Sequence, residues 1–254
     1  MNYFFVLGAR DPEMIEIAGV LEAQGIGYTP AKFGRLPVRS SDAYRATSVH
    51  GLIPRHARRI FVECDVFGLT PDEVCDHHSP GDSGYGLPPE QYLQGSSLGQ
   101  VLDLLRLKPS AEQRITAAAD HCLRHAYEGR CPGVDPSDLA AWRERSRADA
   151  RGITVKEIQH RIEFATDALQ SAPRIHVAGE EIAWFPLSSP LPSEVAEASA
   201  RLGTAFCYVK RDGDRRKGGI MSATPHVIRA WMRECGLKHV YGDPARGFAG
   251  GYYL

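Results

Sequence analysis

The sequence predicts an α/β protein in which a parallel-sheet N-terminal domain is joined by a helix to a smaller α/β C-terminal domain. Apolar, β-rich runs alternate with helix-like segments in the first part of the chain, and this alternation is typical of a parallel sheet. After Pro173 the pattern changes to short extended pieces with two helices among them. We therefore expect an N-terminal domain over residues 1–152, a connecting helix over 153–172 and a C-terminal domain over 173–254.

The composition excludes several classes of protein. Of the 254 residues, 43% are hydrophobic and 24% are charged, and 30 Lys and Arg against 31 Asp and Glu give a net charge of −1. These values exclude a disordered chain, a coiled coil and a globally basic coat, so a long nucleic acid is not expected as a partner. The apolar runs are far short of the ~20 residues of a membrane span, and no secretory signal is evident. We expect a cytoplasmic protein with no membrane partner.

The cysteines are spread along the chain, at positions 64, 75, 122, 131, 207 and 235. None of them forms a Cys-x-x-Cys pair, which argues against both a disulfide framework and a zinc ribbon. We expect reduced and mostly buried thiols.

The first elements of the N-terminal domain follow from hydrophobic spacing. Tyr3–Leu7 is a short β-rich run, and apolar residues then recur at helical spacing over residues 14–21. A second extended piece follows at Tyr28–Phe33. The next stretch, Gly34–Arg59, is rich in Pro, Gly, Ser and Arg, and its role as a lid or a decoration stays open.

Two further strands each end in an acid. Ile60–Asp65 is an apolar run that ends in Asp65, and Glu73–Asp76 repeats this pattern after one short loop. In open α/β sheets, ligands gather outside the carboxyl ends of the parallel strands. The sequence therefore predicts that the acids lie where a ligand would bind.

The later part of the domain is predicted to be helical. Ser96-Ser97 can cap a helix that contains several leucines, and a further helix leads to Asp120. Thr154 and Glu157 form a capping box, followed by apolar residues on one helical face up to Pro173. We interpret this last helix as the bridge between the two domains.

Asp76-His77-His78 is the sharpest local signal in the chain, because it directly follows an apolar run and precedes a glycine-rich loop. On the turn that leaves a strand, two adjacent histidines can converge on one site, whereas within a strand they would point to opposite faces. Other acids are expected near it: Asp11, Glu13, Asp65 and Asp120. Carboxylates gathered in this way repel one another unless a cation neutralises them. Oxygen ligands with one imidazole suit Mn²⁺ or Mg²⁺ better than Zn²⁺, and one shared carboxylate would hold two ions ~3.5–4 Å apart.

The order of these residues resembles the DHH phosphoesterase superfamily, which includes RecJ-like exonucleases, oligoribonucleases, cyclic-dinucleotide phosphodiesterases and manganese-dependent family II pyrophosphatases. The family pattern has an Asp-x-Asp after the first strand, a lone Asp ending a later strand, the DHH tripeptide, a small-residue helix and a further Asp. The corresponding residues here are Asp11-Pro12-Glu13, Asp65, Asp76-His77-His78, Ser96-Ser97-Leu98-Gly99 and Asp120. A small C-terminal lobe with a Gly-rich substrate loop would correspond to Gly242–Gly251. The resemblance therefore spans nearly the whole chain.

The resemblance implies a role for each residue of the first domain. Asp65 would bridge two metal ions, His77 would bind one of them, and Asp76 would orient His77. The acids Asp11 and Glu13 would serve one ion each, and Asp120 would complete the second site. His78 would face the substrate phosphate, so that His78 and Asp76 form the catalytic pair.

The sequence departs from the family pattern at several positions. Leu7 stands where a histidine usually lies, the second acid of the first motif is Glu13, and Arg246 replaces a histidine of the C-terminal loop. Four alternatives stay open: His121 replaces the missing ligand, only one metal ion binds well, catalysis has been lost, or the alignment is mistaken.

In the C-terminal domain, the glycine-rich end of the chain is the predicted substrate grip. Arg246 offers a planar guanidinium to an anion, and Gly247, Gly250 and Gly251 would allow close backbone approach. The basic run of residues 210–217 is interpreted as a solvated hairpin tip, with guidance of a phosphate as the alternative.

These observations predict a hydrolase: a Mn²⁺- or Mg²⁺-dependent phosphoesterase with two ions. It would cleave a phosphodiester or related phosphoester of a small nucleotide or short oligonucleotide in the cleft between two lobes. A nucleotide-binding sensor or regulatory protein without catalysis is the first alternative, and a pyrophosphatase-type hydrolase is the second. The base, linkage and length of the substrate stay open, as does the oligomeric state, including a homodimer.

Overall fold

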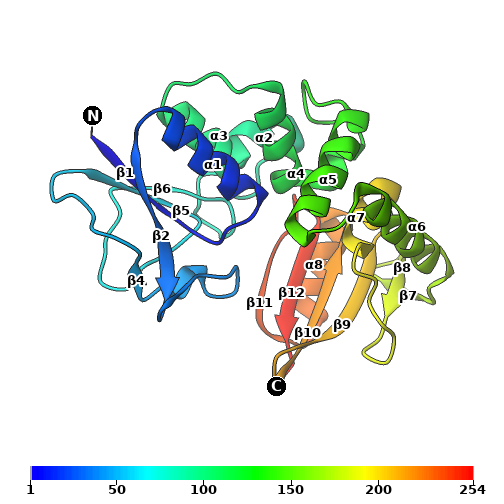
Figure 1. Ribbon diagram of the computed structural model, residues 1–254. Coiled ribbons are helices and arrows are strands. Elements are labelled where there is room, and N and C mark those ends of the chain that lie inside the picture. Colours follow the sequence, from blue (N-terminus) through cyan, green and yellow to red (C-terminus); the bar gives the residue numbers. More distant parts are fainter. Residues whose placement is uncertain (1, 254) are drawn as a thin grey trace. The chain divides into compact units, whose positions relative to one another are not determined.

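The computed structural model describes residues 2–253, and the chain divides into two compact units (Figure 1). The first unit comprises Met1–Leu87 and Gln91–His121, and the second comprises Pro88–Glu90 and Cys122–Leu254. Each unit is built from helices around its own sheet. The predicted α/β fold class, with a parallel sheet in the N-terminal part, is confirmed. Among the described residues, no helix is both long enough and apolar enough to cross a membrane.

The sheet of the first unit has β1 (Tyr3–Leu7) at its centre. Strands β2 (Gly27–Phe33) and β5 (Arg58–Val62) pair with β1 in parallel, and β6 (Glu73–Cys75) pairs in parallel with β5. Because the three strands β1, β5 and β6 run in the same direction, their carboxyl ends lie at one edge of the sheet. This edge carries the residues discussed below as the candidate site.

The strand register places specific residues at this edge. Leu7 is paired with Val62, and Val62 is paired with Cys75. The residues that follow in each strand are therefore neighbours as the chain leaves the sheet: Gly8, Glu63 and Asp76. A Cβ at Gly8 would lie 2.4 Å from the main-chain oxygen of Glu63, so only glycine allows this close approach of the two chains.

The helices of the first unit are α1 (Pro12–Ala23), α2 (Tyr92–Gly95), α3 (Ser97–Leu104) and the first part of α4 (Ala111–Tyr127). Asp11 caps α1 by accepting a hydrogen bond from the Met14 N–H, and Ser96 caps α3 in the same way through the Gly99 N–H. Cys122 has non-helical backbone angles and breaks α4 where one unit ends and the other begins.

The segment Gly34–Arg59, which the sequence left without a role, covers part of the first sheet. It contains β3 (Leu36–Pro37), the 3₁₀ helix η1 (Ala43–Arg45) and β4 (Ser48–Val49). Three of its buried side chains, Val38, Ala43 and Ala46, pack in one cluster with Val6 and Phe61 of the sheet. The segment is therefore part of the core of the first unit.

The second unit has a mixed sheet with the strand order β11-β12-β10-β9-β8-β7. The bounds of its strands are Arg174–Val177 for β7, Glu180–Phe185 for β8, Phe206–Asp212 for β9, Arg215–Met221 for β10, Lys238–Asp243 for β11 and Phe248–Tyr252 for β12. Only β8 and β9 pair in parallel among the described strands of this sheet. Two separate cores lie against this sheet, one with α6 (Val155–Ser171) and α7 (Val195–Leu202), the other with α8 (Pro225–Glu234).

The observed division of the chain differs from the predicted boundary at residue 152. Helix α5 (Pro136–Arg151) and the predicted connecting helix, which is α6, both belong to the second unit. Arg143 of α5 bonds to Glu197, and Arg147 and Arg151 bond to Glu194. These buried ion pairs tie α5 to the start of α7. Hydrophobic spacing does not show them, because the residues involved are charged.

Candidate active site

Asp76, the first residue after β6, folds the tripeptide Asp76-His77-His78 into a turn. Its Oδ1 accepts hydrogen bonds from the N–H of His77 at 2.6 Å, from the N–H of His78 at 3.0 Å and from Nδ1 of His78 at 3.0 Å. The hydroxyl of Tyr44 donates to the same carboxylate. Burial by itself would raise the pKa of Asp76, but the hydrogen bonds from His78, Tyr44 and His77 together hold this pKa below its usual value.

The orientation of His77 is set by contacts at its Nδ1 atom. The side chain is fully buried, and Nδ1 lies 2.9 Å from the carbonyl oxygen of Gly95. Because a carbonyl only accepts hydrogen bonds, we assign the ring hydrogen of a neutral His77 to Nδ1. Nε2 then presents a lone pair on the opposite side of the ring, which is the arrangement of a metal-binding imidazole.

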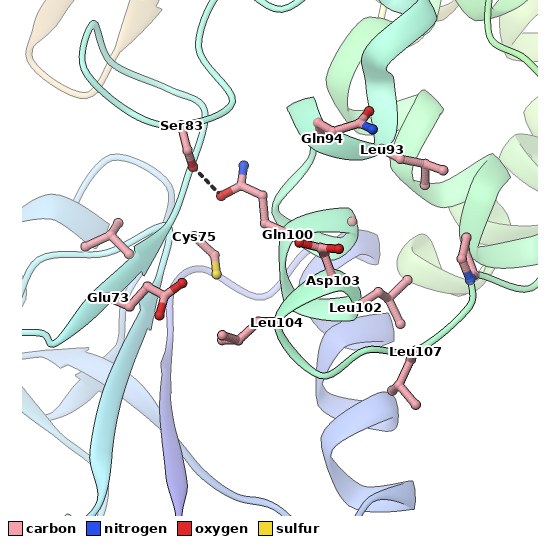
Figure 2. Close-up of a pocket in the computed structure, with 13 residues that line it drawn as sticks. Glu73, Cys75, Ser83, Leu93, Gln94, Gln100, Leu102, Asp103, Leu104 and Leu107 are labelled. Carbon is pink, nitrogen blue, oxygen red and sulfur yellow. Dashed lines mark hydrogen bonds between the residues drawn. The ribbon is translucent and has the colours of Figure 1, made fainter. Parts of the chain in front are cut away.

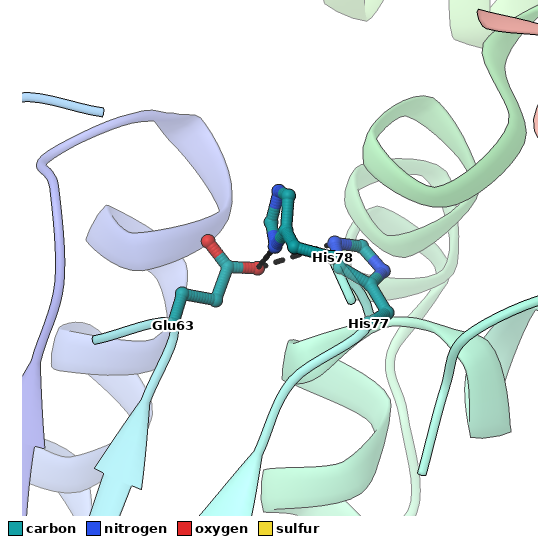
Figure 3. Close-up of side chains that lie close together, drawn as sticks. All are labelled: Glu63, His77 and His78. Atoms are coloured by element: carbon teal, nitrogen blue, oxygen red, sulfur yellow. Dashed lines mark ion pairs between the residues drawn. The ribbon is translucent and has the colours of Figure 1, made fainter. Parts of the chain in front are cut away.

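Three carboxylates surround Nε2 of His77. This atom lies 3.1 Å from Oδ2 of Asp120 and 3.3 Å from Oε1 of Glu63. One ligand atom each from Glu13, Glu63, His77 and Asp120 lie within 4.8 Å of one another. Glu63 also forms a second such group with His77 and His78, as Figure 3 shows. Glu63 is therefore shared between two groups of candidate ligands.

Helix α1 and the end of strand β5 position Glu13 and Glu63 next to His77. Glu13 lies in the first turn of α1, and its Oε1 accepts a hydrogen bond of 2.9 Å from the N–H of Leu98 at the start of α3. Glu63 directly follows β5 with a positive φ of 49°, which turns the chain out of the sheet. The hydroxyl of Ser97 donates to Oε1 of Glu63 at 2.8 Å.

The electrostatics of the cluster favour a cation. Burial, with the charges of Asp120 and Glu63, raises the pKa of Glu13 well above its usual value and that of Asp11 to about 7. Oε2 of Glu13 is buried and has no hydrogen-bond partner among the described residues. A buried carboxylate oxygen without a partner is costly unless a proton or a metal ion binds it. The donor set of carboxylate oxygens and one imidazole nitrogen fits Mn²⁺ or Mg²⁺.

The structure brings together most of the predicted residues. Glu13, His77 and Asp120 form one group, and His78 joins the second. Asp11 lies outside both groups but close enough to interact electrostatically with Asp120 and Glu63.

Asp65 is a correction to the predicted site. It is exposed, its main chain bonds to Ala43 and Ala46, and it belongs to neither group. The strand β5 ends at Val62, so the acid that leaves the sheet at the carboxyl edge is Glu63. By Asp65 the chain has already turned to pair with the segment around η1. The family pattern has an Asp at this place, whereas the residue that follows β5 here is Glu63.

His121 and Asp76 also act differently from the prediction. His121 contacts Nδ1 of His77 at 3.3 Å, on the ring side opposite the carboxylates, while its own Nε2 lies 3.0 Å from the carbonyl oxygen of Leu87. His121 therefore supports the ring of His77 from the side away from the carboxylates. It does not lie where it could replace the missing ligand histidine. Asp76 bonds to the main chain of His77 and to the ring of His78, so it orients His78. The ring of His77 is oriented by Gly95 and His121.

Sequence reasoning missed three residues at the site, Tyr44, Glu63 and Gly95, and it named Ser97 only as part of the small-residue helix, without its bond to Glu63. A signal existed for Glu63, because it is the first polar residue after an apolar strand, as Asp76 is after β6. No pattern pointed to Tyr44, which lies in the segment that could not be assigned. The contact of Gly95 is made by its main-chain oxygen, which carries no side-chain signal.

A cavity of about 480 Å³ lies beside β6 and α3 in the first unit (Figure 2). Its lining includes Cys75, Leu102 and Gln100 but none of the grouped ligands. Gln100 links the cavity to the site, since its side chain accepts from the N–H of Asp76 at 3.0 Å and donates to the Asp76 carbonyl at 3.1 Å. Gln100 thus fixes the strand end from which His77 and His78 project.

The glycine-rich segment that was predicted to bind substrate, Gly242–Gly251, is not an open loop. Gly247, with φ +77°, forms the turn between β11 and β12, and the guanidinium of Arg246 lies 5.2 Å from the ring centroid of Phe248. Gly250 and Gly251 lie within β12 and are buried. The places of their absent side chains are filled by Tyr241 and Leu237, respectively. These two glycines therefore serve packing, and the role of Arg246 stays a prediction.

No protein-family model and no curated protein matches the chain. Among solved structures, it is similar to the pGpG-specific phosphodiesterase PggH from Vibrio cholerae, with 11% identity and a TM-score of 0.43 over 100% of this chain and 93% of that chain. It is also similar to RecJ from Thermus thermophilus in complex with Mn²⁺, with 14% identity and a TM-score of 0.44 over 99% of this chain. The match covers 49% of RecJ, so the chain spans about half the length of that protein.

The correction from Asp65 to Glu63 makes a direct prediction. Asp65→Asn is expected to keep metal affinity and activity within about twofold of the parent, because surface substitutions away from a site have small effects. Isothermal titration with Mn²⁺ and a phosphodiesterase assay on the same preparation measure both quantities. Loss of Mn²⁺ binding in Asp65→Asn would return Asp65 to the ligand set.

Proposed function

We propose that the chain is a metal-dependent phosphoesterase that hydrolyses a phosphodiester or related phosphoester of a small nucleotide or short oligonucleotide. The arrangement of Glu13, Glu63 and Asp120 around the Nε2 lone pair of His77 carries this proposal. Three acids and a lone pair in one buried position are mutually repulsive. A divalent cation would relieve this repulsion, and it would also activate a water and stabilise charge on a phosphate.

The residues that would hold the metal are Glu13, Glu63, His77 and Asp120, with Asp11 nearby. Because Glu63 belongs to both groups of ligands, it is the carboxylate that would be shared if two ions bind. The thiols of Cys64 and Cys75 belong to neither group of candidate ligands, and burial raises the pKa of each to about 12. We therefore favour Mn²⁺ or Mg²⁺ over Zn²⁺.

A divalent metal ion bound here would supply a water with a lowered pKa and would neutralise phosphate charge. The chain itself supplies the proton transfer. Asp76 accepts a hydrogen bond from Nδ1 of His78, which holds the ring proton at that atom and leaves the Nε2 lone pair to accept a proton from the attacking water and then to pass that proton to the leaving oxygen. The His78 side chain is 36% exposed, so a substrate can reach it. Tyr44 donates to Asp76 and keeps that carboxylate in place.

The substrate class rests on the size and charge of the chain. A net charge of −1 does not favour a long polyanion, because each phosphate that is neutralised normally needs a Lys or Arg. Recognition of the substrate by Arg246 of the second unit is part of the proposal.

The test is hydrolysis of bis-p-nitrophenyl phosphate, of a 5′-phosphorylated dinucleotide and of inorganic pyrophosphate, each with EDTA, Mn²⁺ or Mg²⁺. We expect mononucleotides from the dinucleotide only with a metal ion, and no phosphate from pyrophosphate. Binding of the dinucleotide without turnover would favour the sensor alternative. Turnover of pyrophosphate alone would favour the pyrophosphatase alternative. Turnover that is unchanged in EDTA after metal stripping would overturn the metal-dependent proposal.

A further inference from the structure

Two thiols of the second unit lie in contact, and the proposed hydrolytic site uses neither of them. The Sγ atoms of Cys122 and Cys131 are 3.3 Å apart, and one thiol donates a hydrogen bond to the other. Both side chains are buried, and neither forms a disulfide in this structure. The thiols of Cys64 and Cys235 donate instead to main-chain carbonyl oxygens. Cys122 and Cys131 therefore differ from these isolated thiols in having each other as partners.

The local fold brings the two cysteines together across the end of helix α4. Cys122 lies inside α4 with non-helical backbone angles, φ −153° and ψ 55°. After the helix, a turn is closed by a hydrogen bond from the N–H of Val134 to the carbonyl oxygen of Cys131. Gly133 in this turn has a positive φ of 77°, which glycine adopts without a steric cost. The turn places Cys131 against Cys122, which lies 9 residues before it.

A disulfide between these residues needs little movement. The sulfur atoms of a disulfide are roughly 2.0 Å apart, so the two Sγ atoms, now 3.3 Å apart, must approach by about 1.3 Å. Two thiols can also share a soft metal ion, but such an ion needs further ligands. Among residues 2–253, neither thiol belongs to a group of possible metal ligands. The contact therefore favours a disulfide over a metal site.

The pair lies directly beside the histidine that supports His77. Cys122 follows His121 in the chain, and Nδ1 of His121 lies 3.3 Å from Nδ1 of His77. A shift of the main chain at Cys122 is transmitted to His121 through the peptide bond that they share. The His121 ring has no free space on the side of Gly95, because a Cβ at Gly95 would lie 2.4 Å from that ring. Such a shift therefore changes the contact between the two histidines.

We propose that Cys122 and Cys131 form a reversible disulfide, with a peroxide as the oxidant, and that this bond displaces the ring of His121 from His77. One thiol, as its thiolate, attacks an oxygen of hydrogen peroxide. The S–O bond forms as the O–O bond breaks, which gives a sulfenic acid and hydroxide. The second thiol attacks the sulfenic sulfur, and the S–S bond forms as the S–O bond breaks and water leaves.

The reaction is balanced and reversible. The two thiols lose two electrons and two protons, and the peroxide becomes two molecules of water. A dithiol restores both thiols by thiol–disulfide exchange and is itself oxidised to a disulfide. Neither the disulfide nor the displacement of His121 needs a metal ion or hydrolysis, so both go beyond the proposed function.

The first test is oxidation of the full chain by excess hydrogen peroxide in EDTA, followed by alkylation of free thiols and mass spectrometry of an unreduced tryptic digest. Cleavage after Arg124 and Arg130 leaves the two cysteines in separate peptides, residues 115–124 and 131–143. We expect these peptides to be joined in the oxidised parent and to separate after treatment with dithiothreitol.

Two variants control this test. Cys131→Ser cannot form the disulfide, and circular dichroism verifies that it is folded. Cys207→Ser is the matched control, because it removes another buried thiol of the second unit, and it should form the disulfide as the parent does. The peptide map of the parent needs no variant, so the test stands even if Cys131→Ser is unstable.

Nuclear magnetic resonance of the histidine rings in EDTA measures the effect on the site. The signals of His121 and His77 should shift when the parent is oxidised and return with dithiothreitol, and they should not shift in Cys131→Ser treated in the same way. Affinity for Mn²⁺ should fall at least about tenfold on oxidation, the scale for groups behind a ligand. This last expectation rests on the proposed function, and a reduced parent that does not bind Mn²⁺ would count against that function alone.

Three results would overturn the proposal. The first is that the two peptides stay separate after oxidation, or that either cysteine is converted to a sulfinic acid. The second is a disulfide at Cys122 and Cys131 with unchanged ring signals of His121 and His77, which would overturn the link to the site. The third is Zn²⁺ that binds the reduced parent but not Cys131→Ser, which would make the pair a metal site.

Discussion

Glu63→Gln is expected to lower phosphodiester hydrolysis by roughly 10³-fold or more, the scale seen when a central catalytic group is removed. Its carboxylate lies in both groups of candidate ligands, so a neutral amide weakens every ion that binds there. Gln has the same shape as Glu and can still accept the hydrogen bond from Ser97, so the fold should be retained. Affinity for Mn²⁺ should fall at least ~100-fold, because changes even to the groups behind a ligand cost roughly 10- to 100-fold.

The measurements for Glu63→Gln are isothermal titration with Mn²⁺ and steady-state hydrolysis of bis-p-nitrophenyl phosphate. Asp65→Asn is the matched control, since it makes the same change of charge two residues away at an exposed position. Circular dichroism confirms that both variants are folded. If Glu63→Gln bound Mn²⁺ as tightly as the parent, the shared-carboxylate interpretation would be wrong.

The metal-free protein is expected to lose stability as the pH rises from about 4 to 7. The pKa of Asp11 is raised from 3.8 to about 7 by burial and by the charges of Asp120 and Glu63. A raised carboxyl pKa means that the folded state binds more protons than the unfolded state in this range, so the free energy of unfolding falls with rising pH. For Asp11 alone the change corresponds to at most roughly 4 kcal/mol.

Asp11→Asn should remove this contribution without removing the helix cap, because Asn caps helices about as well as Asp. In EDTA at about pH 7.5, the variant should melt higher than the parent by roughly 5–10 °C, and the difference should vanish near pH 4. The parent should recover most of this stability when Mn²⁺ is added. Thermal unfolding followed by circular dichroism at several pH values measures each quantity.

Asp135→Asn is the matched control for Asp11→Asn. Asp135 also caps a helix, but hydrogen bonds from Ser137 and Asp138 lower its pKa. A lowered carboxyl pKa stabilises the fold above the unfolded pKa, so this variant should be no more stable than the parent at about pH 7.5. An equal rise in melting temperature for both variants would show a general effect of Asn and contradict the role of charge repulsion at Asp11.

The edge of the sheet that carries the site was predictable from the sequence, but the exact ligands were not. Apolar runs that end in acids indicated parallel strands whose carboxyl ends meet, and Asp76 and His77 lie at that edge. The choice between Glu63 and Asp65 depended on where β5 ends, and strand ends are set by hydrogen bonds to neighbours that a sequence does not show. The family pattern has an Asp at this position and therefore favoured Asp65, whereas the structure places Glu63 in the site.

Contacts made by the main chain or by charged helix faces could not be predicted, because they leave no distinctive pattern of residue types in the sequence. The carbonyl of Gly95 orients His77, and a carbonyl is common to all residues. Helix α5 joins the second unit through Arg143, Arg147 and Arg151, whereas charge runs on helices are usually solvated. Tyr44 reaches Asp76 only because its segment folds back over the sheet.

The packing around Gly95 offers a way to recognise related proteins by sequence. A Cβ at this position would lie 2.4 Å from the ring of His121, so the histidine that backs His77 and any side chain at residue 95 exclude each other. The glycine lies 18 residues after His77, and His121 lies 44 residues after it. A chain that keeps a glycine and a histidine at comparable distances from its second DHH residue is expected to preserve the same imidazole pair. Loss of both together would mark a lineage that orients this histidine by other means.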